Sequence, residues 1–101
     1  MDRRLKLQTL LESIKGVSKA YFQPPETVKM SYPCIVYSLD ADKGLHANNS
    51  LYFLRKRYML TVIDKNPDSV IPDTVRGLPY CDFERSYKKD NLNHWVFTIY
   101  F

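Results

Sequence analysis

The two histidines and two cysteines are the residues of this chain best suited to hold a metal ion or to attack a substrate. Cys34 and Cys81 stand 47 positions apart, without the closely paired spacing of a zinc site. His46 and His94 fall in an expected loop and at the start of an expected strand, and neither has a cysteine or carboxylate at ligand spacing. We therefore interpret the cysteines as buried free thiols and the histidines as non-catalytic.

Three carboxylates, those of Asp64, Asp68 and Asp73, lie close together in the sequence and are of the type that binds Mg²⁺. The simpler interpretation makes Asp64 and Asp68 a turn residue and a helix cap around Pro67. No Ser or Cys stands in a recognisable nucleophile turn. We expect no catalytic residue, metal or cofactor, so the protein is predicted not to be an enzyme. A small enzyme whose site assembles from scattered residues is a weaker alternative.

Two basic clusters, at residues 55–57 and 88–89, form a second kind of candidate site. Tyr52, Phe53 and Tyr58 lie beside the first, and basic residues interleaved with aromatic ones hold nucleic-acid strands by charge and stacking. The alternative is a solvated strand entry whose arginines protect a sheet edge or pair with acidic side chains. Fifteen Lys and Arg against eleven Asp and Glu give a net charge of +4, which tolerates an anionic partner without demanding one.

Length and composition predict one globular domain, residues 1–101. Hydrophobic residues make up 45% of the chain and aromatic residues 14%, which is enough to form a core without disulfides. No apolar run approaches the ~20 residues needed to span a bilayer, and the charged start is followed by an amphipathic pattern rather than a signal peptide. We expect no membrane association and a protein made in a reducing cytoplasm.

Residues 57–63 are predicted to form the central strand, because both of their alternating side-chain sets are mostly apolar. The strand stops at residues 64–68, where Asn, Asp and Pro favour a turn, and Asp68 or Ser69 can cap the helix that follows. This helix is expected over residues 69–76, with Pro72 in its first turn.

The remaining pattern predicts a helix over residues 3–15 that ends at Gly16 in a left-handed conformation, with strands over 17–22 and 34–39. The polar segment 40–50 between the strands is long for a connection, so it is a candidate functional surface.

The C-terminal part alternates over residues 80–87 and 94–101 around an Asn- and Asp-rich turn, which predicts a hairpin. Cys81, Phe83, Arg85 and Tyr87 are expected on one side of the first strand. Trp95, Phe97, Ile99 and Phe101 share one face of the second, which should be buried. The expected fold is α+β, with a small mixed or antiparallel sheet and two helices packed on one face.

Several of these segments together resemble the small tail terminator, or tail completion, proteins of long-tailed (siphovirus) phages. Each segment is a turn, cap or strand pattern, so the specificity lies in their order and spacing from about Tyr21 to Phe101. The segments are YFQPPE at 21–26, MSYPCIVY at 30–37, RYMLTVIDKNPDS at 57–69, IP at 71–72, LP at 78–79, DNLNH at 90–94 and FTIYF at 97–101.

The resemblance implies an α/β protomer that forms a homo-oligomeric ring, usually a hexamer, at the head-proximal end of the tail tube. There the ring would end tube polymerisation and offer a docking surface to the head. The implied partners are other copies of the chain, the tail tube protein, a head-completion or connector protein, and DNA that passes without sequence recognition. The implied location is the virion tail, assembled in the host cytoplasm. Cys34 stands where a small apolar residue is expected, which affects packing rather than role.

A ring requires contacts between different surfaces of neighbouring copies, and the loop over residues 40–54 with the basic strand entry is the expected source of such a contact or of channel-lining residues. The competing class is a small nucleic-acid-binding module that uses the basic and aromatic patch Arg55 to Tyr58, with Lys88 and Lys89. The candidate interface or channel residues are Lys43, His46, Asn48, Asn49, Tyr52, Phe53, Arg55, Lys56 and Arg57.

Overall fold

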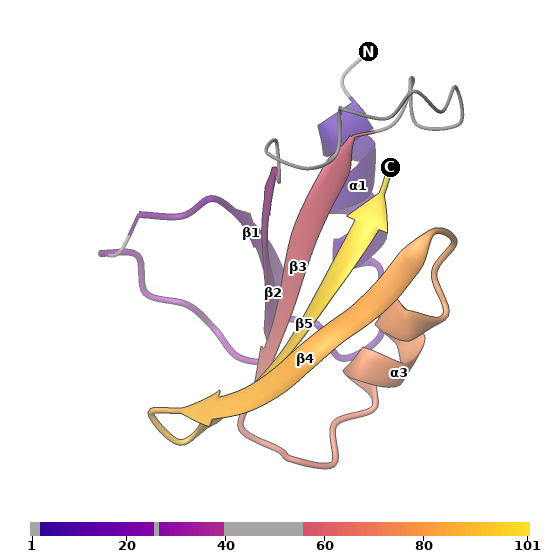
Figure 1. The fold of residues 1–101 in the computed structure, drawn as a ribbon. Helices are drawn as coiled ribbons and strands as arrows, with labels where there is room; N and C mark the ends of the chain where they lie inside the picture. Colours follow the sequence, from indigo (N-terminus) through magenta and orange to yellow (C-terminus); the bar gives the residue numbers. More distant parts are fainter. Residues whose placement is uncertain (1–2, 26, 40–55) are drawn as a thin grey trace.

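A computed structural model describes residues 3–25, 27–39 and 56–101 of the protein (Figure 1). They form two helices and five strands, and the predicted α+β class is confirmed. None of the described helices is long and apolar enough to cross a membrane. The elements are α1 (Arg3–Glu12), β1 (Lys19–Phe22), β2 (Cys34–Leu39), β3 (Arg57–Asp64), α3 (Ile71–Arg76), β4 (Cys81–Lys89) and β5 (Leu92–Tyr100).

All five strands belong to one mixed sheet with the order β1-β2-β3-β5-β4. β1 pairs with β2 in parallel, and the other three pairings are antiparallel. β3 therefore lies in the middle, as its two apolar faces predict. The sheet has β1 at one edge and β4 at the other, and Figure 1 shows β4 crossing in front of β5.

The core lies between one face of the sheet and the two helices, both of which lie behind the sheet in the view of Figure 1. β3 contributes every second residue to this face, because successive side chains of a strand point to opposite sides. Trp95 is half-buried and packs against the core, whereas Phe97 and Ile99 are inside it. The buried cluster consists of Leu7, Leu11, Ile14, Ala20, Ile35, Tyr37, Tyr58, Leu60, Val62, Ile71, Val75, Phe97 and Ile99.

Both helices are shorter than the sequence indicates. α1 ends at Glu12 rather than residue 15, and the Ser13 hydroxyl donates to the Leu10 carbonyl (2.6 Å) at this end. Gly16 has the predicted positive φ, +98°. α3 begins at Ile71, and its N-cap position is Val70, so the prediction that Asp68 or Ser69 occupies the cap is wrong. The Ser69 hydroxyl instead accepts from the Ile71 N–H (3.3 Å), one position before the cap.

The hairpin of β4 and β5 closes through Asp90 and Asn91, whose φ angles are +54° and +63°. Positive φ at both central residues is typical of the type I′ turn, which matches the twist of paired strands. A bulge between Phe83 and Arg85 then shifts the register of β4. The prediction that the alternate residues from Cys81 to Tyr87 share one side of the strand is therefore wrong. Phe83 lies opposite Phe97 on the helix side, whereas Arg85 lies opposite Val96 on the other side.

Candidate functional site

The predicted contact loop coincides for the most part with segments that the structure does not describe. Lys56 and Arg57 are the two candidates inside the described residues, at the entry to β3. The other seven lie outside them, namely Lys43, His46, Asn48, Asn49, Tyr52, Phe53 and Arg55.

The strand entry is held against the end of the chain. Lys56 is exposed, and its backbone exchanges two hydrogen bonds with Phe101, of 3.5 and 2.9 Å. Arg57 is half-buried opposite Tyr100 on β5. Tyr58 is only 4% exposed and belongs to the core. A nucleic-acid strand at this entry would therefore meet Lys56 and Arg57 rather than the Tyr58 ring.

The described residues of the two basic clusters lie at opposite ends of the sheet. Arg57 is level with Tyr100 on β5, whereas Lys88 is level with Asn93. Seven residues of extended strand separate these positions on β5, or ~24 Å at about 3.4 Å per residue. The fold does not bring these described basic residues into one patch.

The acidic residues after β3 form a turn. The Asp64 carboxylate is buried and accepts from the Asn66 N–H (3.1 Å), and the Asn66 side chain accepts in turn from the Asp68 N–H (2.9 Å). Asn93 of β5 donates to the carbonyl groups of Asp64 and Lys65, both at 3.3 Å. Asp64 thus has the predicted turn role. Within the described ranges, no group of three or more His, Cys, Asp or Glu is placed to hold a metal ion.

Both cysteines are free thiols. Cys34 is fully buried on β2, as predicted, whereas Cys81 at the start of β4 is half-buried. Burial, with a smaller contribution from the Asp64 carboxylate, raises the pKa of Cys34 to about 11. Burial and then Asp82 raise the pKa of Cys81 to about 11. Both groups stay protonated at neutral pH, which makes them poor nucleophiles.

β4 carries an exposed array of aromatic and charged side chains, which alternation alone did not reveal. Every residue after Cys81 is exposed. On the side away from the helices, Tyr87 stacks on His94 with ring centroids 4.6 Å apart and an interplanar angle of 9°, and the Arg85 guanidinium lies 5.9 Å from the Tyr87 ring. On the helix side, Phe83 packs edge-on against Phe97 at 5.4 Å.

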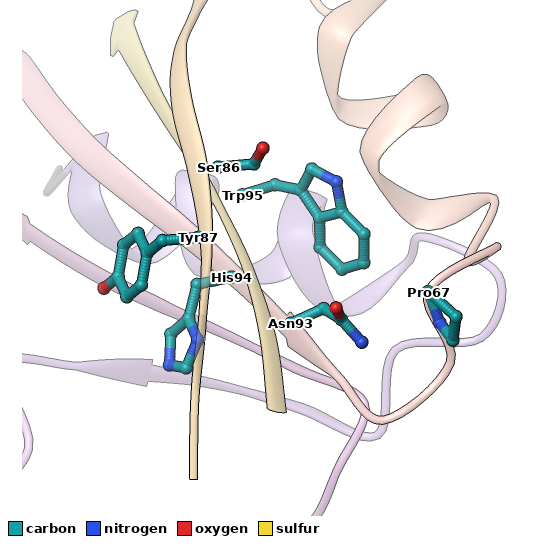
Figure 2. A pocket seen from close by; sticks show the side chains of 6 residues that line it. All are labelled: Pro67, Ser86, Tyr87, Asn93, His94 and Trp95. Carbon is teal, nitrogen blue, oxygen red and sulfur yellow. The ribbon is translucent and has the colours of Figure 1, made fainter. Parts of the chain in front are cut away.

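A hollow of about 240 Å³ lies between the hairpin and the turn after β3 (Figure 2). Figure 2 shows Trp95 and Asn93 on the side of Pro67, with Tyr87 and His94 across the strands. An indole, an amide and a hydroxyl line this open hollow beside the stacked rings of Tyr87 and His94, and this mixed lining suits a polar or aromatic side chain of a partner. The sequence places Pro67 far from the hairpin, so this site was missed. Its lining residues are Pro67, Ser86, Tyr87, Asn93, His94 and Trp95.

Comparisons with protein-family models, with curated proteins and with solved structures gave no significant match for this chain.

Proposed function

We propose that the protein is a structural virion protein of a phage or prophage, which forms a ring at the head-proximal end of the tail tube. It ends polymerisation of the tube there and provides the docking surface for the head. The resemblance of the segments between Tyr21 and Phe101 to tail terminator proteins is the basis of the proposal. The protomer that this resemblance implies contains both helices and strands, as the described α+β fold does.

The observation that carries the proposal is the placement of the polar and aromatic side chains outside the core. In the part of the chain that the structure describes they are spread over the exterior of the sheet, and those that line the hollow beside Trp95 stand at an open surface. β4 is the clearest case, because eight of its nine residues are exposed and they include Phe83 and Tyr87. Aromatic and charged side chains on an exposed strand suit a protein that works through contacts between surfaces.

Charge sets a condition on such a ring. Six copies, each of net charge +4, would together carry +24. Lys56 and Arg57 near a channel would suit passing DNA, but the repulsion between copies opposes closure at low salt. Acidic residues such as Asp82 and Glu84 on neighbouring copies would offset part of this repulsion.

Sedimentation and negative-stain microscopy of the purified full chain, free of nucleic acid, test the proposal. We expect closed particles of one size at physiological salt, and shorter, more uniform tubes when the protein is added to polymerising tail tube protein. A chain that never closes into a ring and leaves tube length unchanged would contradict the proposal.

A nucleic-acid-binding module is the second candidate, favoured by the exposed Lys88 and Lys89 close to the stacked pair Tyr87 and His94. This function predicts retention on DNA or RNA that falls steeply with salt. Replacing Lys88 and Lys89 by Ala should then reduce the slope of log affinity against log salt by ~2, because each phosphate contact contributes about 0.9. Retention that is weak in all salts would exclude this candidate.

A further inference from the structure

The two edge strands of the sheet, β1 and β4, differ in how far side chains cover their outward backbone groups. At the β1 edge, the Gln8 amide donates to the Ala20 carbonyl (2.8 Å), and the Glu12 carboxylate accepts from the Ala20 N–H (3.3 Å). Side chains of α1 thus occupy the backbone groups that another strand would need. Such coverage is a usual protection of sheet edges. At the β4 edge, the structure gives no comparable side-chain cover for the described strand.

The backbone of β4 alternates between groups that pair with β5 and groups that point away. The Tyr100 N–H donates to the Tyr80 carbonyl (3.1 Å), which makes these residues a hydrogen-bonded pair. Hydrogen-bonded and non-hydrogen-bonded pairs alternate in an antiparallel ladder, so Cys81 and Phe83 direct their backbone groups outward. At the other end of β4, the two-residue turn closes on the hydrogen-bonded pair of Lys89 and Leu92. Because the two kinds of pair alternate, Lys88 and Ser86 are the residues on this side of the bulge whose backbone groups point outward.

These four outward positions are self-complementary. When a second β4 strand is laid antiparallel to the first, only one register matches all four outward residues with outward residues. It sets Cys81 opposite Lys88 and Phe83 opposite Ser86 of the second copy. The two-fold axis then passes between Glu84 and Arg85, at the bulge. The bulges of the two copies therefore lie opposite each other, and the extra residue in one strand is matched by the extra residue in the other.

Charge agrees with this register. The first half of β4 carries Asp82 and Glu84, and the second half carries Arg85, Lys88 and Lys89. An antiparallel copy therefore brings each acidic half against a basic half. Both side chains at the bulge lie on the side away from the helices, because Glu84 accepts from Thr98 (3.0 Å) and Arg85 lies opposite Val96. Glu84 of each copy therefore lies opposite Arg85 of the other copy, and these two pairs of opposite charges favour the pairing of the strands.

We propose that two copies of the protein associate through their β4 edges in this register, and form a continuous ten-stranded sheet. A bulge and lysines on an edge usually discourage pairing with foreign strands. Here they leave one partner whose bulge and charges match, the same strand in a second copy. This contact is isologous and closes at two copies, so it differs from the heterologous contact of a ring and does not rest on the proposed function.

Charge reversal tests the contact in solution. Sedimentation of the full chain should show a concentration-dependent doubling of mass, from monomer to dimer or, where rings form, from one ring to two. Arg85→Glu should weaken it by about tenfold, because like charges then meet on both sides of the axis. The double variant Glu84→Arg with Arg85→Glu should restore it. Lys19→Glu changes the net charge by the same amount on the covered β1 edge and should leave the dimer unchanged.

Disulfide cross-linking tests the register. Lys88→Cys places a thiol opposite Cys81 of the second copy, where the Cα atoms of a hydrogen-bonded pair are about 5.5 Å apart, within the range of a disulfide. Oxidation should give a covalent dimer in this variant, but not in the wild type or in Lys89→Cys, whose thiol points to the other face. Cys34 is buried and does not compete.

A monomeric wild type overturns the proposal, as does a dimer that Arg85→Glu leaves unchanged or equal cross-linking at positions 88 and 89. Failure of Lys88→Cys to fold would be seen by circular dichroism, and the charge-reversal series then decides the outcome. Rings of Arg85→Glu that form as in the wild type but no longer pair would support both proposals, because the β4 contact is separate from the heterologous contact of the ring.

Discussion

At the scale of single residues, burial decides which aromatic side chains stabilise the fold and which remain for contacts. Phe97 is fully buried, whereas Phe83, which packs against it edge-on, is 39% exposed. The Arg76 guanidinium lies 4.7 Å from the Phe83 ring centroid, so this ring joins the core to the charged surface. Burial also decides the role of Tyr58. Its ring belongs to the core, so it is not part of the surface that the preceding basic residues, Lys56 and Arg57, occupy.

Replacing Phe97 by Ala should lower the free energy of unfolding by ~3–5 kcal/mol, because it removes a large side chain from a closed core and leaves a cavity. Chemical denaturation measures the change. Phe83→Ala is the matched control and should cost clearly less, since part of its ring already faces water. A loss below about 1 kcal/mol for Phe97→Ala would show that this face of β5 is not buried.

At the scale of elements, α1 has two roles, because its apolar stripe covers the sheet and its polar residues cover the β1 edge. Gln8 links the two roles. Its amide donates to the Ala20 carbonyl, and its side-chain oxygen accepts from the buried Tyr37 hydroxyl. Arg4 also donates to the Tyr37 hydroxyl, at 3.3 Å. The helix, the edge strand and the second strand are therefore joined by one polar network at the margin of the core.

Gln8→Ala should destabilise the protein by ~1–3 kcal/mol, because it removes the hydrogen bond that the buried Tyr37 hydroxyl donates to the Gln8 side chain. In a Tyr37→Phe background the same change should cost much less, since no buried hydroxyl is left to satisfy. A double-mutant cycle by chemical denaturation gives the coupling. Additive losses would mean that the two side chains do not stabilise each other.

Strand positions were predictable from the sequence because alternation and turn residues are local signals. β2 has the predicted bounds, 34–39. β3 begins at the predicted residue, Arg57, and ends at Asp64, one residue later than predicted. The side assigned to Arg85 and Tyr87 was not predictable, because a bulge adds one residue without a glycine or proline to mark it. The cap of α3 was also missed, since Ser69 hydrogen-bonds one position too early to act as the cap.

At the scale of the whole molecule, the candidate sites depend on contacts between distant segments. The turn at Asp64 is held by Asn93, and the hollow beside Trp95 is lined on one side by Pro67. Neither pairing follows from residue spacing. The basic residues of the two clusters that the structure describes are likewise at opposite ends of the sheet, with Lys56 and Arg57 at one and Lys88 at the other. Local patterns thus predicted the scaffold, whereas its surfaces required the register of the strands.

The predicted loop contact can be tested without disturbing this scaffold. Leu39 and Tyr58 are direct partners across β2 and β3, so the ends of the connection are already adjacent. Deleting residues 44–50 leaves nine of the sixteen residues 40–55, which is ample to join neighbouring antiparallel strands. We therefore expect the deletion variant to be folded and soluble, with the denaturation midpoint close to that of the wild type.

If the loop supplies the ring contact, the same variant should no longer form rings or cap tail tubes, as seen by negative-stain microscopy and tube length. Replacing residues 44–50 by a Gly and Ser linker of equal length is the control that separates loop chemistry from loop length. Loss of rings in both variants would assign the contact to side chains of this segment, among them His46, Asn48 and Asn49. Rings and capped tubes like those of the wild type in both would leave the segment as a solvated connection, because the heterologous contact would then come from elsewhere on the protomer.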